Sequence, residues 1–562
     1  MKKIVSTFYE LKASAALALL LATLLLAGIV TATAGASTPP PNPQTYNFAY
    51  YFAWYDSMPA HGITGDQIVI GNLQDHTAHA EVYFAGELTP YASIDIPAHT
   101  TSPPVTRPGY MGGPVRVVST GGDALMVTQR VFYKNSFNEV AAIEGDNLDS
   151  SYYFTWYDSK TADGMNGNWL LIANEDTQQA TVDVFIGDKK MGTYTIDPGK
   201  DVTPVYPEKI GGPVRVVSTN GMKLMASQRI IYHDSFSEVM GYPASLLDSV
   251  YFFTWYDMTN NFSPGDWILI ANLNDSVVHA SVYVGGSSNP VGTYPIGPHQ
   301  DVTPTYAGLM NGPVRVVCTD CTRTEKIMVS QRSLYKQSFD EVLGTPPSGL
   351  DSEMDFSIYN NRPSEGFNSW VMISNQGGGN AAANVYIGDS LQPRDSFNIG
   401  QSGRETPSYP GLKDGPVRVL SDGKPLLASE RTLYNDSFCE LVGLPRKSTG
   451  QLLPQAPELQ LVYVDSAWAD YENGVLASRF RIVNQGAGTA LGTSVTSVHA
   501  DSGVDENTKL PLSLGDIPGK GGYADFTIDF NVSPELRSFK TTIFAHCKDS
   551  SGADYYYPSA PR

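Results

Sequence analysis

The stretch that decides the fold runs from Gly212 to Glu238 and reads GPVRVVSTNGMKLMASQRIIYHDSFSE. Further copies begin at Gly113, Gly312 and Gly415, each with Pro-Val-Arg, then an Arg preceded by Gln or Glu, then Ser-Phe-x-Glu. The Arg of Pro-Val-Arg stands at positions 116, 215, 315 and 418, at intervals of 99, 100 and 103 residues. Such a regular period predicts one folded unit copied in tandem.

Each copy belongs to a repeat made of short segments typical of β-strands. In the second repeat these segments are 152–158, 169–174, 181–186, 192–196, 213–217, 224–232 and 236–240. They are rich in aromatic and β-branched residues and are separated by Gly, Pro, Asn and Asp turns. Seven strands in about 100 residues predict a two-sheet, immunoglobulin-like β-sandwich. A propeller would need repeating blades of about 40–50 residues, and the repeat has no similar halves.

The predicted fold class is all-β, a tandem array of five immunoglobulin-like β-sandwich domains after an N-terminal signal segment. The predicted domains are a signal peptide or membrane anchor (1–36), a linker (37–45), repeats 1 to 4 (46–146, 147–245, 246–347 and 348–445), a second linker (446–455) and a fifth sandwich (456–562). Repeat 4 diverges, with Ile358 where the others have Trp and Glu430 where they have Gln. Terminal repeats diverge when they contact something other than a sister unit.

The N-terminus predicts export. Lys2, Lys3 and Lys12 precede an apolar run over 13–32, and small residues follow it. This order is typical of a secretory signal. The alternative is an uncleaved anchor, because about 20 apolar residues can span a bilayer.

Composition narrows the class of partner. The chain has 57 acidic and 37 basic side chains, a net charge of -20. This charge repels nucleic acid phosphates and anionic lipids. With 52 Gly, 38 Pro and four Cys in 562 residues, turn-rich β structure held by apolar burial is expected, and not a disulfide scaffold.

Two resemblances follow from these motifs. The repeats resemble tandem β-sandwich repeats of secreted and cell-surface bacterial proteins, through Trp169, Leu171, Asn174, Arg215, Gln228, Arg229 and Tyr232. The segment from Phe480 to Ala490 is similar to the bacterial cell-adhesion-related (CARDB-like) domain. The resemblances imply a surface or extracellular setting with binding or scaffolding roles, and they carry over no catalytic residue.

The most regular polar residues are two Arg and one Glu in every repeat. They could bind carboxylates or sulfates, because the guanidinium fork matches such groups. The favoured interpretation is a structural network of ion pairs and hydrogen bonds that ties the last strands together, because shared packing repeats whole strand patterns. The set is Arg116, Arg130, Glu139, Arg215, Arg229, Glu238, Arg315, Arg332, Glu341, Arg418, Arg431 and Glu440.

The aromatic openings of the repeats are candidates for ligand stacking. Alternation along a strand places their rings on both faces, and only one face must enter the core. Tyr50, Tyr55, Tyr152 and Tyr157 are the candidate residues for stacking against sugars or another protein. Core and inter-repeat packing is the favoured alternative, because adjacent units need an apolar contact.

Loops after the opening strands are rich in Asp, Asn and Gly. Calcium would require several of their oxygens to converge, and ordinary turns use the same residues. The calcium candidates are Asp158, Asp163 and Asn166.

The cysteines predict one local bridge. Cys318 and Cys321 replace a hairpin turn of the sister repeats, which favours a disulfide in an exported protein. Cys439 and Cys547 fall in different predicted domains, where they either bridge the two or stay free.

No catalytic motif is recognisable, because the sequence lacks a Gly-x-Ser-x-Gly elbow, a His-Glu-x-x-His pair and a phosphate loop. We therefore expect a non-catalytic, exported scaffold or elongated adhesion stalk at the cell surface or outside the cell. Expected partners are surface polymers, glycans, other surface proteins or a second copy, with no cofactor unless calcium binds. The alternative is a multivalent carbohydrate-binding protein that uses exposed aromatics on the repeats.

Overall fold

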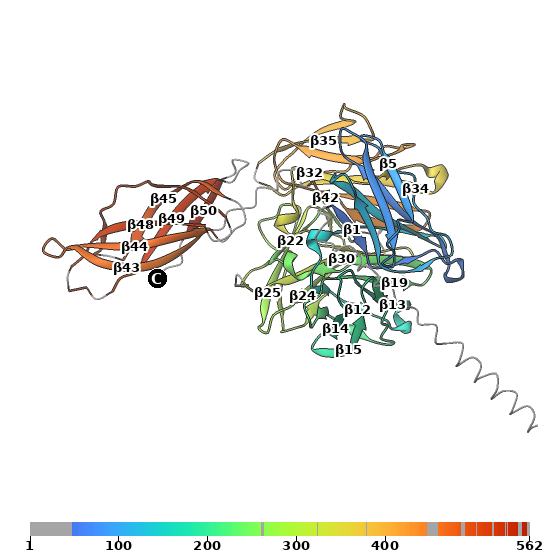
Figure 1. Cartoon of the computed structure of the whole chain (residues 1–562), viewed down its shortest axis with the longest axis horizontal. Coiled ribbons are helices and arrows are strands. Elements are labelled where there is room, and N and C mark those ends of the chain that lie inside the picture. Colours follow the sequence, from blue (N-terminus) through green and yellow to red (C-terminus); the bar gives the residue numbers. More distant parts are fainter. Residues whose placement is uncertain are drawn as a thin grey trace, which may run out of the picture. The chain divides into compact units, whose positions relative to one another are not determined.

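The computed structural model describes residues 48–558, with gaps at 260–263, 323, 378, 447–458, 485–488, 502, 520–521, 534, 537 and 549–553. The chain divides into two compact units, Met1–Pro445 and Arg446–Arg562, which we call the repeat unit and the C-terminal unit. The predicted signal segment and the first linker lie outside the described residues, as does most of the second linker. Both units are all-β, as predicted (Figure 1).

Each repeat consists of a first sheet, a second sheet and a two-stranded ribbon. In repeat 1 the first sheet has the order β10 (Ile143–Glu144), β1 (Ala49–Phe52), β7 (Val115–Ser119), β4 (Ala78–Phe84) and β5 (Ala92–Ile96). The second sheet contains β3 (Ile63–Asn72), β8 (Leu125–Tyr133) and β9 (Ser136–Ala141). The ribbon pairs β2 (Tyr55–Asp56) with β6 (Met111–Gly112).

Repeat 2 has the same plan. Its first sheet contains β21 (Tyr242–Pro243), β11 (Ser151–Phe154), β18 (Val214–Ser218), β14 (Ala180–Ile186) and β15 (Lys189–Ile196). Its second sheet contains β16 (Lys200–Val202), β13 (Met165–Asn174), β19 (Leu224–Tyr232) and β20 (Ser235–Met240), and its ribbon pairs β12 (Tyr157–Asp158) with β17 (Ile210–Gly211). All seven segments predicted as strands in this repeat are strands.

Repeat 3 follows the same order. Its first sheet contains β22 (Val250–Phe253), β29 (Val314–Cys318), β25 (Val278–Val284) and β26 (Gly292–Ile296). Its second sheet contains β27 (Asp301–Val302), β24 (Pro264–Asn272), β30 (Ile327–Tyr335) and β31 (Ser338–Leu343), and its ribbon pairs β23 (Tyr256–Asp257) with β28 (Met310–Asn311).

Repeat 4 keeps the plan despite its divergent sequence. Its first sheet contains β42 (Leu444–Pro445), β32 (Glu353–Phe356), β39 (Val417–Ser421), β35 (Ala381–Ile387) and β36 (Asp395–Ile399). Its second sheet contains β37 (Arg404–Glu405), β34 (Phe367–Asn375), β40 (Leu426–Tyr434) and β41 (Ser437–Val442), and its ribbon pairs β33 (Tyr359–Asn360) with β38 (Lys413–Asp414).

The C-terminal unit is a sandwich of two four-stranded sheets. One contains β43 (Leu459–Asp470), β44 (Val475–Asn484), β48 (Gly522–Asn531) and β46 (Asp505–Glu506). The other contains β47 (Leu512–Ile517), β45 (Ala490–Ala500), β49 (Thr541–Lys548) and β50 (Asp554–Pro558). Its core includes Phe480, Phe526, Phe530 and Cys547.

Short 3-10 turns lie between strands in the described part of the repeat unit. They are η2 (Pro59–His61), η3 (Gly145–Asn147), η4 (Thr161–Asp163), η5 (Ala244–Leu246), η6 (Pro347–Gly349) and η7 (Pro363–Glu365). In the described part of the chain, no helix is long and apolar enough to cross a membrane.

The glycine of the Gly-Pro-Val-Arg phrase is fixed by a close approach to the opening strand. A Cβ on Gly212 would lie 2.1 Å from the carbonyl oxygen of Thr155. The corresponding distance at Gly113 is 1.9 Å to the oxygen of Ala53. Only glycine therefore allows the ribbon to return to the first sheet at this point.

The opening strands hold neighbouring repeats together. Tyr50 and Phe52 of β1 enter the core of repeat 1, whereas Tyr51 on the other face enters the core cluster of repeat 2. In the same way Tyr153 packs against the core of repeat 3, and Phe252 enters that of repeat 4. Each of these three strands therefore serves two cores by simple alternation.

The four repeats form a closed ring and not a linear array. We call β9, β20, β31 and β41 the closing strands, because each is the last strand of its second sheet. β9 contacts β20, β20 contacts β31, β31 contacts β41, and β41 returns to β9. Figure 1 shows the blue strands of repeat 1 beside the yellow and orange strands of repeat 4. The expectation of an elongated stack of these repeats is therefore wrong, because the last repeat docks on the first.

Candidate functional site

The closing strands meet through a cyclic set of four hydrogen bonds. The serine that begins each Ser-Phe-x-Glu motif accepts a bond from the backbone N–H of the phenylalanine in the next repeat. The bonds are Phe236 N to Ser136 Oγ at 3.0 Å, Phe339 N to Ser235 Oγ at 3.1 Å, Phe438 N to Ser338 Oγ at 3.0 Å and Phe137 N to Ser437 Oγ at 3.1 Å. The fourth bond joins repeat 1 to repeat 4, so the motif closes the ring.

The variable residue of the motif faces the same junction. Asn138 Oδ1 accepts from Glu238 N at 3.1 Å, and Asp340 Oδ2 accepts from Glu440 N at 2.8 Å. Asn138 Nδ2 also donates to Asp340 Oδ1 at 3.3 Å, which connects repeats 1 and 3 directly. Burial raises the pKa of Asp340 to about 8, and the neighbouring carboxylates add to the effect of burial.

The arginine of Gln-Arg and the glutamate of Ser-Phe-x-Glu form a buried ion pair in every repeat. The pairs are Arg130–Glu139, Arg229–Glu238, Arg332–Glu341 and Arg431–Glu440, with N–O distances of 2.5 to 2.9 Å. Each guanidinium also lies over the phenylalanine of its own motif, 4.8 to 5.1 Å from the ring centre. Eight of the predicted polar residues are thus brought together inside the ring.

The second glutamate oxygen reaches across to the neighbouring repeat. Glu341 Oε1 accepts from Thr155 Oγ1 at 3.0 Å and from Ser330 Oγ at 2.8 Å. Glu440 makes the equivalent bonds to Thr254 and Ser429. The ion pair therefore fastens its own closing strand and the opening strand of the preceding repeat at once.

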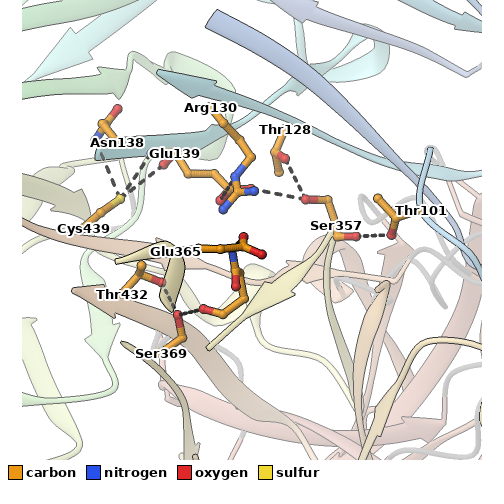
Figure 2. Close-up of polar contacts among 11 residues, drawn as sticks. Thr101, Thr128, Arg130, Asn138, Glu139, Ser357, Glu365, Ser369, Thr432 and Cys439 are labelled. Atoms are coloured by element: carbon orange, nitrogen blue, oxygen red, sulfur yellow. Dashed lines mark hydrogen bonds and ion pairs between the residues drawn. The ribbon is translucent and has the colours of Figure 1, made fainter. Parts of the chain in front are cut away.

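The same arrangement joins repeat 4 to repeat 1. Figure 2 shows Ser357 between Thr128 and Glu139, with Oγ–Oγ and Oγ–Oε1 distances of 2.7 and 3.2 Å. Thr101 donates to the backbone oxygen of Ser357, and Cys439 Sγ accepts from Glu139 N at 3.2 Å. Beside these polar contacts, Phe137 of repeat 1 packs against Phe367 and Tyr434 of repeat 4, so the junction combines hydrogen bonds with an aromatic cluster.

The arginines of Pro-Val-Arg do not join this network. They lie on the first sheet, and each stacks over an aromatic ring of the neighbouring strand, at centroid distances of 4.5 to 5.2 Å. The pairs are Arg116–Tyr83, Arg215–Phe185, Arg315–Tyr283 and Arg418–Tyr386. The prediction that they share one network with the other arginines is wrong, because the two sets belong to different sheets.

A second polar position beside the ion pairs changes from repeat to repeat. In repeat 1, Gln129 Nε2 donates to both oxygens of Asp66 at 2.9 Å, and Gln331 binds Asp266 in the same way in repeat 3. Repeat 2 replaces the carboxyl with Asn168, which accepts from Gln228 at 3.0 Å. Burial raises the pKa of Asp66 and of Asp266 to about 7.

Repeat 4 moves this carboxyl to the opposite strand. Ser369 occupies the position of Asp66 and bonds Thr432, and Glu430 replaces the glutamine. Burial raises the pKa of Glu430 well above its usual range. Repeat 4 therefore keeps one carboxyl in this pair of strands, on β40 and not on β34.

The four tyrosines that were candidates for ligand stacking lie in the cores, as the favoured packing interpretation expects. Tyr50, Tyr55, Tyr152 and Tyr157 are buried, with exposed fractions of 0 to 2%. The hydroxyl of Tyr55 donates to the backbone oxygen of Asp66, and that of Tyr157 donates to the backbone oxygen of Asn168. These rings fill the cores and present no surface to a ligand.

The calcium candidates are engaged with the backbone. Asp158 Oδ1 accepts from Lys160 N at 2.9 Å, and Asn166 Nδ2 donates to His233 O at 2.9 Å. Asp163 lies in η4. Among the residues described, no group of three or more His, Cys, Asp and Glu side chains could hold a metal ion.

The cysteines occupy three separate places. A disulfide joins Cys318 and Cys321, which are adjacent to the end of β29. Cys439 is a buried thiol on closing strand β41, and burial raises its pKa well above the usual range. Cys547 is buried in the core of the C-terminal unit.

Between repeats 1 and 2 lies an open cavity of about 440 Å³. Trp54 of repeat 1 and Trp169 of repeat 2 line it, together with Tyr133. His61 and Asp56 form an ion pair at its wall, with an Nδ1–Oδ2 distance of 2.8 Å. The sequence marks both tryptophans as recurring residues but gives no sign that they line one cavity.

Comparison with known proteins finds no matching family model and no curated relative. Solved structures align at low similarity. Salmonella α-2-macroglobulin is 11% identical, with a TM-score of 0.16, and the alignment covers 87% of this chain and 38% of that one. A Ca²⁺-stabilised, ice-binding adhesin of an Antarctic bacterium is 9% identical, with a TM-score of 0.15 and coverages of 73% and 97%.

Proposed function

We propose that this chain is a non-catalytic, exported scaffold or adhesion protein of the cell surface or extracellular space. The observation that carries the proposal is the use of the recurring polar residues. All four Arg–Glu pairs are enclosed, with exposed side-chain fractions of 1 to 13%, and three of the four glutamates hydrogen-bond to a neighbouring repeat. Residues enclosed in this way hold the repeats together and meet no substrate.

The leader-like N-terminus supports export, and the adhesive role rests on the resemblance of the C-terminal unit to the CARDB-like domain. In this proposal the repeat unit is a rigid, compact body and the C-terminal unit contacts the partner. Surface polymers, glycans or other surface proteins are the proposed partners. The proposal requires no cofactor.

Fractionation tests the location. Antibody detection in medium, wall, membrane and cytoplasmic fractions should find the chain outside the cytoplasm, and a protein confined to the cytoplasm would contradict the proposal. A panel of polysaccharides and peptides incubated with the purified chain should show no turnover. Turnover abolished by Glu341→Gln would identify the network as an active site and overturn the non-catalytic assignment.

A further inference from the structure

The C-terminal unit has an open pocket of about 380 Å³ beside edge strand β43. Tyr463 and Trp468 of this strand line it, together with Phe480 and Phe539 from inside the unit. The size falls in the range of small-ligand sites, roughly 300–1,000 Å³. The pocket is large enough for a ring-sized group.

Two aromatic side chains of this pocket are exposed, unlike those of the opening strands of the repeats. Tyr463 is 44% exposed and Trp468 is 37% exposed. Most of strand β43 is exposed, whereas the opening strand β1 is buried along its whole length. Tyr463 and Trp468 thus have the exposure that the carbohydrate-binding alternative requires and that the four candidate tyrosines of the repeats lack.

A chain of hydroxyl groups runs along the wall of the pocket. Tyr463 Oη bonds Ser466 Oγ at 2.8 Å, and Ser466 Oγ bonds Ser478 Oγ at 2.8 Å. Tyr463 and Ser466 are the donors of these bonds, so Ser478, which lines the pocket, keeps its own hydroxyl hydrogen for a further acceptor.

The charge of the lining indicates a neutral ligand. All residues that line the pocket are uncharged, although the whole chain carries a net charge of -20. A ligand that matches this lining offers an apolar face to the aromatic rings and an oxygen to the unused hydroxyl hydrogen. A purely aliphatic ligand would cover that donor without satisfying it, which disfavours binding.

We propose that this pocket binds one ring of a neutral sugar, whose C–H face packs on Trp468 and whose hydroxyl oxygen accepts the hydrogen bond. The proposal rests on the adhesion role proposed above and names the chemical class of its partner. Tyr463 and Trp468 provide the stacking surface, and the Ser466–Ser478 pair determines the orientation of the ring.

Titration of the full chain with defined sugars tests the site. The probes are maltotriose, cellotriose and tri-N-acetylchitotriose, followed by saturation-transfer NMR and tryptophan fluorescence. At least one probe should bind saturably. Trp468→Ala should weaken that binding about tenfold, a loss of about 1.4 kcal/mol. Ser478→Ala should weaken it severalfold, because the end of the hydroxyl chain is removed.

Tyr523→Ala is the matched control, because Tyr523 is a 56% exposed aromatic residue of the same unit outside the pocket. The affinity of the Tyr523→Ala variant for the sugar should equal that of the unmodified chain. Absence of saturable binding of every probe, or equal losses in Trp468→Ala and Tyr523→Ala, would overturn the proposal. If none of the sugars binds but 1-octanol binds tightly, the pocket is assigned to aliphatic ligands and the sugar proposal is overturned. In either case, detection of the chain at the cell surface by fractionation would still support the proposed scaffold function.

Discussion

Beside the ion pairs, the position of Asp66 in repeat 1 and Asn168 in repeat 2 determines how the stability of the ring depends on pH. Asp66 and Asn168 occupy equivalent positions and make the same kind of bond to a glutamine. Only the first can titrate. Repeats 1 and 2 therefore provide a natural comparison of an ionisable and a neutral form of one site.

Asp66→Asn should increase the stability of the repeat unit at pH 8. Burial raises the pKa of Asp66 to about 7, and an unfolded carboxyl titrates near 3.9. Between about pH 4 and 7 the folded state therefore holds a proton that the unfolded chain has lost, and the free energy of unfolding falls as pH rises. The variant should be about 1–3 kcal/mol more stable at pH 8 and unchanged at pH 4, by urea denaturation. Asn168→Asp should behave in the opposite sense, and identical pH profiles for both variants would contradict this account.

The two arginine sets should differ in their contribution to stability. Removing Arg229 leaves Glu238 buried without its charged partner, and such losses cost about 3–5 kcal/mol. Arg215→Ala removes only a guanidinium stacked 4.7 Å from Phe185 and should cost about 1 kcal/mol. Urea denaturation of both variants gives the comparison. A larger loss in Arg215→Ala would mean that the first sheet, and not the ion pair, holds the repeat together.

At the scale of elements, the residue after the opening strand joins repeats 2, 3 and 4 to the next repeat through one hydroxyl. Thr155 donates to Glu341 Oε1 and exchanges a bond of 2.6 Å with Ser330. Repeat 1 has Ala53 at this position, so its junction with repeat 2 lacks the contact. The strength of each junction is thus set separately along the chain.

Thr155→Val should weaken the junction between repeats 2 and 3 by about 1–2 kcal/mol, because the shape is kept and one buried hydrogen bond is lost. Thermal unfolding of the full chain measures the change. Thr155→Ser keeps the hydroxyl, as Ser357 does in repeat 4, and should lose less than half as much. Equal losses would assign the effect to the methyl group.

The strand pattern was predictable from the sequence, and the closure of the ring was not. Alternation and turn residues predicted strands such as 169–174 and 224–232, because both signals are local. A tandem period is the same in an open and a closed array, since it says nothing of the rotation between units. Ligand stacking by Tyr50 and Tyr152 stayed open as an alternative to core packing, because alternation cannot show that both faces of β1 and β11 are covered.

The polar network was only partly predictable. Recurrence identified Glu139 and Arg130, but their partner Ser357 lies 218 residues away from Glu139. No local pattern reports such a contact. The exposed Trp468 lies in the C-terminal unit, which is not repeated, so a search for recurring residues does not find it.

At the scale of the whole molecule, the repeat unit should be compact in solution. A compact body of about 400 residues has a radius of gyration of about 21 Å. Small-angle scattering from residues 46–445 should give a value close to this. An end-to-end array of four sandwiches would give a clearly larger radius and a rod-like distance distribution, and that result would rule out the ring.

The bond between Phe137 N and Ser437 Oγ joins residues 300 positions apart. A ribosome that adds about 5–20 residues per second needs roughly 15–60 s to make such a stretch. During this time repeat 1 waits with Phe137 and Glu139 uncovered, although both are buried in the finished ring. The first repeat made is therefore the longest exposed to chaperones and proteases, and the order of synthesis makes its junction with repeat 4 the last to form.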